Sequence, residues 1–362
     1  MRERKFRVGV LGATGMVGQR FVSLLDGHPW FELTLVGASS RSAGQSYERA
    51  VAGRWALRTA MPSRAASLTV VDASDVAAVA SEVDFVFCAV DMPKEETARL
   101  EEAYARAETP VVSNNSAHRA TPDVPMMVPE INPDHACVIE AQRRRLGVAR
   151  GFIAVKPNCS LQSYVPAIHP LMGLGPTRIA VCTYQAISGA GKTFETWPEM
   201  SDNVIPFIKG EEEKSEQEPL KIWGHLEGGR IVPASAPVIS AQCLRVPTTD
   251  GHMAAVFLSL AKKSSREEII ALWRAYSGRP QELGLPSAPR PFLTYFEEES
   301  RPQTRLDRDL GGGMGVAIGR LRPDAIFDWR FVALSHNTVR GAAGGAVLTA
   351  ELLTQEGWIT RK

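Results

Sequence analysis

A cysteine at a predicted strand–helix junction is the residue of this sequence best placed to do chemistry. Cys159 follows the apolar segment 151–155, which predicts a strand, and precedes residues 160–172, which predict a helix. A thiol at a helix N-terminus loses its proton more easily, because the free N–H groups and the positive end of the helix dipole favour an anion. The position indicates a nucleophilic thiolate, although this segment alone leaves open a small buried core residue.

A histidine distant in the sequence offers the matching acid or base. His252 follows Gly251 at the edge of a predicted strand, 253–260. Imidazole takes up and releases a proton near neutral pH, which suits it to general acid–base catalysis. The other six histidines lack this setting.

The glycine-rich segment 12–18 predicts a dinucleotide site. It has the spacing GxxGxxG, follows a predicted strand at 6–11, opens a helical pattern that ends near Asp26, and leads to a strand at 31–36. In such a βαβ unit a pyrophosphate binds at the helix N-terminus, where glycines let the backbone approach it. A plain turn between strand and helix is the alternative. Together with the thiol and the histidine, this fold predicts acyl transfer through cysteine coupled to hydride transfer.

The residues after the second strand indicate which dinucleotide binds. An NAD site usually has an acidic residue there for the ribose hydroxyls, but this chain has Ser39, Ser40, Arg41 and Ser42. Hydroxyl groups and a guanidinium suit a 2′-phosphate, so the sequence favours NADP. A polar loop with a chance arginine is the alternative.

Alternating strand and helix patterns in the N-terminal part form the scaffold for these residues. Further strands are expected at 68–72, 83–90 and 110–112, with helices at 73–80 and 94–107. The segment 113–119, SNNSAHR, follows the last of these strands, at the edge of a doubly wound sheet where ligands bind. Arg119 would suit a phosphate there, and a turn rich in Asn and Ser is the alternative.

After Cys159, longer alternating runs predict a second sheet. Its strands are expected at 178–187, 238–246, 253–260, 315–321 and 326–334, with helices at 267–276 and up to Leu353. The charged segment 188–229 is expected to be irregular and solvated. The expected fold class is α/β: a Rossmann-type doubly wound parallel sheet, plus a second α+β catalytic and dimerisation domain with a mainly antiparallel sheet. The NADP-binding domain is expected in residues 1–157 and 338–362, and the second domain in residues 158–337.

The composition argues against several other functions. The 362 residues carry a net charge of +1, so no overall field attracts nucleic acid or an anionic membrane. Five scattered cysteines without a CxxC or Cys/His cluster predict free thiols in a reducing compartment and no metal site. Because no signal peptide and no apolar run of about 18 residues is found, we expect a soluble cytoplasmic protein.

Five segments, in order, resemble the aspartate-β-semialdehyde dehydrogenase family, and its archaeal and fungal branch most of all. They are Gly12–Gly18 (GATGMVG), Ser113–Arg119 (SNNSAHR), Pro157–Ser160 (PNCS), Thr183–Gly189 (TYQAISG) and Arg245 with Gly251–His252. The resemblance extends from residue 6 to about residue 353.

The resemblance implies a role for each matching residue. Cys159 would carry the acyl group, His252 would be the acid/base catalyst, and Gln185 would orient the thioester. The substrate would be held by Arg245 at its carboxylate, by Glu211 at its ammonium, by Arg119 and Lys214 at its phosphate, and by Asn115. The NADP contacts would come from Gly12, Thr14, Gly15, Met16, Val17, Ser39, Ser40, Arg41, Ser42, Ser188, Gly189 and Asn337. Three consecutive glutamates, 211–213, leave the register of Glu211 and Lys214 open.

The implied reaction is the reversible, NADPH-dependent reductive dephosphorylation of L-aspartyl-4-phosphate to L-aspartate 4-semialdehyde, through a thioester on Cys159. It belongs to lysine, threonine and methionine biosynthesis. The implied partners are these small molecules, phosphate and a second copy of the chain, in a homodimer or homotetramer, without nucleic acid or membrane. The alternatives are another acyl-cysteine reductase on the same scaffold, such as N-acetylglutamyl-phosphate reductase or malonyl-CoA reductase, and a non-catalytic NADP-binding sensor.

Overall fold

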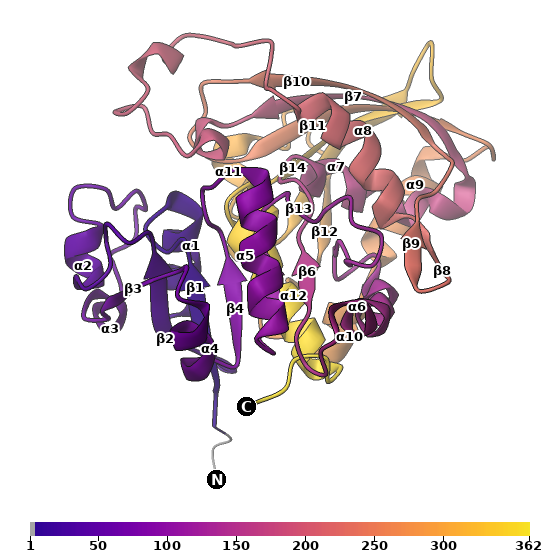
Figure 1. The fold of residues 1–362 in the computed structure, drawn as a ribbon. Coiled ribbons are helices and arrows are strands. Elements are labelled where there is room, and N and C mark those ends of the chain that lie inside the picture. The colour runs from indigo at the N-terminus through magenta and orange to yellow at the C-terminus, as the bar shows by residue number, and fades with distance from the viewer. Residues whose placement is uncertain (1–3) are drawn as a thin grey trace.

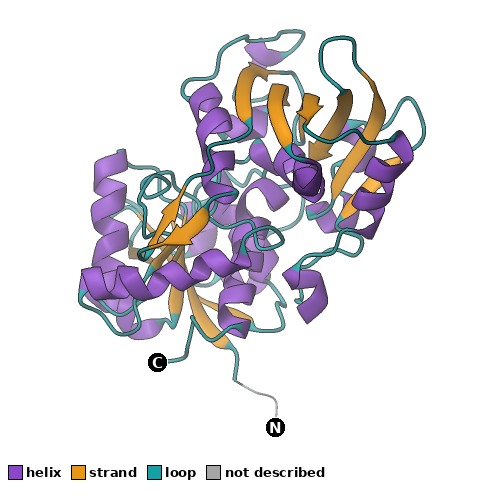
Figure 2. Cartoon of the chain, turned by 90° about the vertical axis from the view of Figure 1, so that its right-hand side faces the viewer, coloured by secondary structure: helices purple, strands orange, loops and turns teal. Residues whose placement is uncertain are grey.

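Two six-stranded sheets organise the chain in the computed structural model, which describes residues 4–362. Figure 1 shows the first sheet in the lower half of the molecule and the second in the upper half, and Figure 2 shows the two groups of strands from the side. Residues 1–3 of the expected first domain lie outside the described residues. The α/β fold class with a second sheet domain is confirmed.

The first sheet is entirely parallel, with the strand order β3-β2-β1-β4-β5-β6. Its strands are β1 (Phe6–Leu11), β2 (Phe31–Ala38), β3 (Val70–Asp72), β4 (Phe85–Cys88), β5 (Val111–Ser113) and β6 (Ile153–Val155). Both faces are buried: Phe85 and Phe87 belong to one core cluster, whereas the alternating Val86 and Cys88 belong to the other. Burial on both faces explains why these strands are short, continuous apolar runs.

Two helices from opposite ends of the sequence cover one face of this sheet. Helix α1 (Met16–Leu25) and helix α12 (Gly344–Gln355) contribute Phe21, Val347 and Leu348 to the same core cluster as β1. Figure 1 shows α12, in yellow, among the indigo and purple elements of the N-terminal half. The expected return of the C-terminal helix to the first domain is therefore observed. Helices α4 (Val76–Glu82) and α5 (Lys94–Arg106) contribute to the cluster on the other face.

The turn between β1 and α1 needs glycine at two positions. Gly12 has φ +79°, and a Cβ there would lie 2.3 Å from the carbonyl oxygen of Ala89. A Cβ on Gly18 would lie 2.1 Å from the carbonyl oxygen of Gly12. The glycine spacing thus lets the turn fold back against both β4 and its own helix.

The second sheet has the order β10-β7-β11-β14-β13-β12 and is mixed. Strands β7 (Pro176–Gln185), β11 (His252–Leu260), β14 (Trp329–Ser335) and β13 (Val316–Pro323) pair antiparallel, whereas the edge strands β10 (Val238–Arg245) and β12 (Leu293–Phe296) pair parallel to β7 and β13. Helices α7 (Leu161–Ile168) and α9 (Arg266–Ala275) share its inner core. Alternation along a strand predicts one buried face but not the direction of its neighbour, so the parallel edges were not foreseen.

The charged segment after β7 contains a helix where an irregular solvated face was expected. Helix α8 spans Glu211–Ile222 and begins after Gly210, whose φ is +71°. Glu211, Ser215 and Glu218 are buried on it, at positions that lie on one helical face. The irregular, solvated segment that was expected here is therefore partly a helix, and one side of that helix faces the site described below, where Glu211 and Lys214 were expected.

The remaining elements are short. The helices are α2 (Tyr47–Ala50), α3 (Ser63–Ala66), α6 (Ile139–Leu146), α10 (Arg279–Leu283) and α11 (Thr304–Asp307), and a separate hairpin consists of β8 (His225–Glu227) and β9 (Arg230–Val232). Short 3-10 segments lie at Pro133–Val138, His169–Leu174, Ile187–Ala190, Pro198–Met200 and Leu310–Gly313, and a π-helical turn at Val339–Ala343 precedes α12. Across residues 4–362, no helix combines the length and the apolar character needed to cross a membrane.

Candidate active site

The structure brings the predicted nucleophile and the predicted acid/base residue into contact. Cys159 lies between β6 and α7, His252 is the first residue of β11, and Sγ of Cys159 lies 3.4 Å from Nε2 of His252. Cys159 is partly buried and His252 is fully buried. Two residues that are 93 positions apart thus meet where the two sheets adjoin.

The hydrogen bonds of His252 define its protonation state. The backbone N–H of Ala186 donates to Nδ1 over 3.0 Å, so Nδ1 is the unprotonated acceptor. A neutral imidazole then carries its proton on Nε2, facing the sulfur. Burial, and then the nearby charge of Arg245, hold the pKa of His252 well below its usual value. His252 is therefore a neutral hydrogen-bond donor toward Cys159.

Arg245 lies next to this pair at the end of β10. Its Nη1 donates to the carbonyl oxygen of Ala186 over 2.7 Å. A Cβ on Gly189 would lie 2.9 Å from this Nη1 and 3.0 Å from Nε2 of His252, so a larger residue there would displace one of these two groups. The guanidinium is buried, which strengthens any ion pair it makes with an incoming carboxylate.

Glu211 joins three neighbours at the other side of the cysteine. Its carboxylate accepts from Nδ2 of Asn158 over 2.8 Å, from Nζ of Lys214 over 3.0 Å and from Nε2 of Gln185 over 3.2 Å. Glu211 is 8% exposed, whereas Glu213 is exposed and Glu212 bonds to Cys243 and Gln242 on β10. Among the three consecutive glutamates, Glu211 is thus the one that faces Gln185 and Asn158.

Arg119 is held by a second acidic residue of α8. Its Nη1 lies 3.0 Å from Oε1 of Glu218, and its Nη2 donates to the carbonyl oxygen of Asn114. The other oxygen of Glu218 accepts from the backbone N–H of Asn158, next to the nucleophile. Glu218 therefore connects Arg119 to the cysteine loop, although no direct contact joins Arg119 to Lys214.

Several of the expected cofactor residues line one cavity at the carboxyl ends of β1, β2 and β4. This cavity of about 820 Å³ is lined by Gly12, Thr14, Gly15, Ser39, Ser40, Arg41 and Ser42. Arg49 and Arg54, which the sequence did not single out, also line it, as does Asp72, whose carboxylate accepts from Ser74. Hydroxyls and arginines beside a glycine turn suit a phosphorylated dinucleotide.

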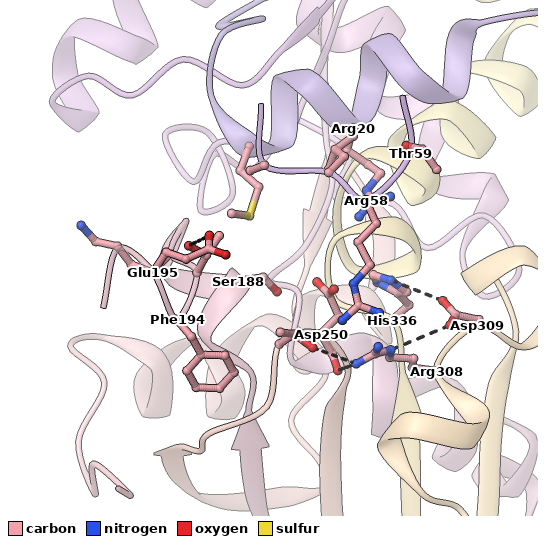
Figure 3. A pocket seen from close by; sticks show the side chains of 16 residues that line it. Arg20, Arg58, Thr59, Ser188, Phe194, Glu195, Asp250, Arg308, Asp309 and His336 are labelled. Carbon is pink, nitrogen blue, oxygen red and sulfur yellow. Dashed lines mark hydrogen bonds and ion pairs between the residues drawn. The ribbon is translucent and has the colours of Figure 1, made fainter. Parts of the chain in front are cut away.

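Two more expected cofactor residues line a separate cavity on the other side of the glycine turn. Figure 3 shows this cavity of about 400 Å³ between helix α1 and the second sheet, with Ser188, Arg20 and His336 among its lining side chains. Met16 also lines it. The amide of Asn337 donates to the hydroxyl of Ser188 over 2.8 Å and accepts from the backbone N–H of Gly251, which precedes His252.

The last expected residues lie close to these groups without lining either cavity. Val17 is on the first turn of α1, partly buried against its core. The side-chain amide of Asn115 donates to the carbonyl oxygen of Val90, a residue of the larger cavity, over 2.9 Å. Asn115, expected at the substrate, is thus anchored toward the cofactor side. Within residues 4–362, no cluster of three or more His, Cys, Asp or Glu residues is arranged to hold a metal ion.

Sequence reasoning missed three polar residues of the site. Asn158 accepts through Oδ1 from the backbone N–H of Ser160, so it caps the start of α7 while its amide holds Glu211. Glu218 connects Arg119 to the loop that carries Cys159. Lys156 is buried at the start of the same loop. The spacing of Glu211, Lys214 and Glu218, three and then four residues apart, is the helical period that could have revealed their shared face.

Comparisons with known proteins agree with this geometry. Two family models match the chain: semialdehyde dehydrogenase, NAD binding domain, over residues 7–139, and semialdehyde dehydrogenase, dimerisation domain, over residues 168–340. The aspartate-semialdehyde dehydrogenase of Methanothermobacter thermautotrophicus is 46% identical, with 96% of this chain and 99% of the relative covered. The aspartate-semialdehyde dehydrogenase of Aspergillus fumigatus is 43% identical, with 98% of this chain and 99% of the relative covered.

A solved structure supports the same assignment. The crystal structure of aspartate semialdehyde dehydrogenase with NADP from Candida albicans has a TM-score of 0.88 and 37% identity, and the match covers 98% of this chain and all of the other. Identity at this level over almost the full length, together with the contact between cysteine and histidine, leaves one assignment. The chain belongs to the aspartate-semialdehyde dehydrogenase family.

Proposed function

We propose that the protein catalyses the reversible, NADPH-dependent reduction of L-aspartyl-4-phosphate to L-aspartate 4-semialdehyde, with release of phosphate. The observation that carries this proposal is the 3.4 Å contact between Cys159 and His252 beside the buried Arg245. We infer from the family that this reaction belongs to the biosynthesis of lysine, threonine and methionine. The free cysteines of the chain fit a reducing, cytoplasmic setting.

The proposed substrate contacts follow from charge. Arg245 would bind the α-carboxylate, because a guanidinium can donate two parallel hydrogen bonds to it. Glu211 would take the α-ammonium, and Arg119 with Lys214 would bind the phosphate. Gln185, whose amide already contacts Glu211, would orient the acyl group. An acetylated amino group has no charge for Glu211, which disfavours N-acetylglutamyl phosphate as the substrate.

The proposed reaction uses two groups of this chain at the reacting carbon. The Cys159 thiolate attacks the acyl phosphate, a C–S bond forms, and the C–O bond to phosphate breaks with release of phosphate. NADPH, when bound, supplies the hydride that reduces the thioester. The Nε2–H of His252 donates to the oxyanion of the tetrahedral species, which then expels the Cys159 thiolate as the aldehyde forms.

The cofactor contacts are proposed from the two cavities. Ser39, Ser40, Arg41 and Ser42 would hold the 2′-phosphate, and the turn with Gly12, Thr14 and Gly15 would hold the pyrophosphate. Further contacts are proposed from Met16, Val17, Ser188, Gly189 and Asn337, toward the nicotinamide. The cavity beside β2 offers hydroxyls and three arginines, Arg41, Arg49 and Arg54, which fits a cofactor with an extra phosphate.

We also propose the domain boundaries and an oligomer. Residues 1–157 and 338–362 would form the NADP-binding domain, since α12 packs beside α1, and residues 158–337 the catalytic and dimerisation domain. Two copies would pair through the outer face of the second sheet, where Tyr184 pairs with Met253 and Cys182 with Ala255. These outward residues are only partly buried or exposed, as expected for an interface that a second copy covers.

The proposal is tested by phosphate-dependent reduction of NADP⁺ with aspartate semialdehyde, using the wild type and Cys159→Ser. The wild type is expected to turn over with NADP⁺ and phosphate, and Cys159→Ser to lose turnover by at least about a thousandfold while its NADP affinity stays within a few-fold. A Cys137→Ser variant, changed at an exposed cysteine, is the control. Substantial activity in Cys159→Ser would refute the thioester, and tight NADP binding without turnover in the wild type would favour a sensor.

A further inference from the structure

Lys221 is a buried lysine whose ammonium is committed to the loop after β5. It lies in the last turn of α8 and is 6% exposed. Its Nζ donates to the carbonyl oxygens of Arg119, Thr121 and Val124 over 2.8, 2.7 and 2.9 Å. Because an ammonium has three N–H groups, each of them has one acceptor in this loop.

Helix α8 therefore holds Arg119 at two points. Glu218, which lies three residues before Lys221 on the same side of the helix, accepts from Nη1 of Arg119 over 3.0 Å. Lys221 binds the backbone carbonyl of the same arginine. One helix thus fixes both the guanidinium and the main chain of Arg119.

The guanidinium of Arg119 keeps one donor unused. Its Nη1 bonds to Glu218 and its Nη2 donates to the carbonyl oxygen of Asn114. Its Nε is buried, and within residues 4–362 this atom has no hydrogen-bond partner. A buried donor without an acceptor is costly, and an anion is the acceptor that a guanidinium favours. The unused donor supports the proposed contact between Arg119 and phosphate.

The loop 114–124 has no helix or strand to fix its shape. Its internal hydrogen bonds are those of turns, such as the bond from the N–H of Thr121 to the carbonyl oxygen of His118. The ammonium of Lys221 joins the main chain at Arg119 to the main chain at Val124. The backbone of Arg119 therefore cannot move away without breaking a charge-assisted hydrogen bond.

The same helix also contacts the loop that carries the nucleophile. The second carboxylate oxygen of Glu218 accepts from the backbone N–H of Asn158 over 2.6 Å, next to Cys159. Arg119 and the cysteine loop are thus both attached to α8, which fixes one relative to the other.

We propose that Lys221 is a positioning residue for phosphate: it fixes the backbone of Arg119, and so places the guanidinium where the phosphate group binds. Lys221 does not itself contact phosphate in this role, because its three donors are used by carbonyl groups. The inference rests on the proposed function, in which Arg119 binds phosphate, and it deepens that function by naming the residue that holds Arg119 in place.

The first test is steady-state kinetics of Lys221→Met in the phosphorylating direction, where inorganic phosphate is a substrate. The KM for phosphate is expected to rise at least about tenfold, while the KM values for aspartate semialdehyde and NADP⁺ stay within about twofold. Lys262→Met is the matched control, because Lys262 is an exposed lysine that donates to the carbonyl oxygen of Gly173. A lysine that only stabilises the fold would not affect phosphate alone, so an unchanged KM for phosphate would overturn the proposal.

The second test is a double-mutant cycle with Arg119→Ala. Because Lys221 is proposed to act through Arg119, adding Lys221→Met to Arg119→Ala should lower kcat/KM for phosphate by no more than about twofold further. Effects of the two substitutions that simply multiply would mean that Lys221 acts independently of Arg119, which would refute the proposal.

A second variant and a measurement on the wild type cover a Lys221→Met protein that does not fold. Lys221→Gln keeps two N–H donors for the carbonyl groups, so its KM for phosphate should lie between those of the wild type and of a complete loss. In the wild type, inorganic phosphate should slow hydrogen exchange in residues 116–124, because binding and loop order are reciprocally coupled. A wild-type KM in Lys221→Gln, or no protection by phosphate, would contradict the proposal.

These outcomes are separate from a failure of the proposed function. If the wild type does not turn over aspartate semialdehyde, the proposed function fails whatever the exchange experiment shows, since exchange needs no turnover. If the wild type is active and Lys221→Met keeps the wild-type KM for phosphate, only the role of Lys221 fails.

Discussion

At the scale of single residues, the backbone N–H of Ala186 decides how His252 can act. By donating to Nδ1 it leaves the ring proton on Nε2, which faces Sγ of Cys159 at 3.4 Å. The imidazole is then equipped to donate to an oxyanion rather than to remove the thiol proton.

Arg245 gives the most direct test of substrate recognition. Arg245→Lys should raise the KM for aspartate semialdehyde strongly, by at least about tenfold, because an ammonium cannot make the two parallel hydrogen bonds of a guanidinium. Steady-state kinetics with both substrates measure the effect. Arg274→Lys, on the exposed side of α9, should leave KM unchanged. Equal KM values for the Arg245 variant and the wild type would move the carboxylate site elsewhere.

The burial of Glu101 predicts that the free energy of unfolding depends on pH. It is fully buried on α5, accepts from Ser113 Oγ over 2.5 Å, and burial raises its pKa to about 7. In the folded state the carboxyl of Glu101 keeps its proton up to a pH of about 7, whereas in the unfolded state it loses that proton above pH 4.5. The stability of the fold therefore falls as the pH rises from 4.5 to about 7.

The variant Glu101→Gln keeps an acceptor for Ser113 without this titration. It should be more stable than the wild type at pH 8 by roughly 1–3 kcal/mol, with the advantage shrinking below pH 5. Urea unfolding at both pH values measures the difference. A constant difference across this range would show that the carboxyl does not titrate as stated.

The sequence was sufficient to predict the reactive residues, but it was insufficient to predict the residues that position them. Cys159 and His252 stand out by type and by position at element ends, where chemistry concentrates. Lys156, Asn158 and Glu218 do not, because a lysine or glutamate in a sequence is equally consistent with a solvated surface. Only the fold reveals that these three side chains are buried together.

At the scale of elements, helix α8 delivers a whole polar face to the site. Glu211, Lys214, Ser215 and Glu218 recur at helical spacing, and three of them are buried. The sequence concealed this helix, because its first turn holds three glutamates and Pro219 lies inside it. Acidic residues at the start of a helix are favourable, and tertiary contacts with the cysteine loop outweigh the proline.

The close packing of the turn between β1 and α1 can be tested by adding one methyl group to a glycine. Gly18→Ala should destabilise the protein by roughly 1–3 kcal/mol and weaken NADP binding, since its Cβ would lie 2.1 Å from the carbonyl oxygen of Gly12. Gly173→Ala is the matched control, because a Cβ there meets nothing within 4 Å. Thermal unfolding and NADP titration of both variants measure the effects, and similar values for the two would contradict the crowding.

At the scale of the whole molecule, the outer face of the second sheet predicts assembly. Ala255 lies in its centre, paired with Cys182 on one side and Val332 on the other. Ala255→Arg should convert the proposed dimer to monomers, because a buried unpaired charge at an interface is strongly unfavourable. Sedimentation velocity measures the assembly state, with the exposed-site variant Lys263→Glu as control. An unchanged oligomer would place the contact on another surface.

The chain passes between the two sheets twice, and both passages lie at the active site. The first, after β6, carries Cys159, and the second, after β14, carries His336 and Asn337 before the turn with Gly341 that packs on the cysteine. Because α12 fills one face of the N-terminal sheet, that sheet lacks part of its core until residue 355 has left the ribosome. The N-terminal sheet is therefore translated first, but its core is completed last. Until then, the nascent chain needs protection of the apolar face that α12 will cover.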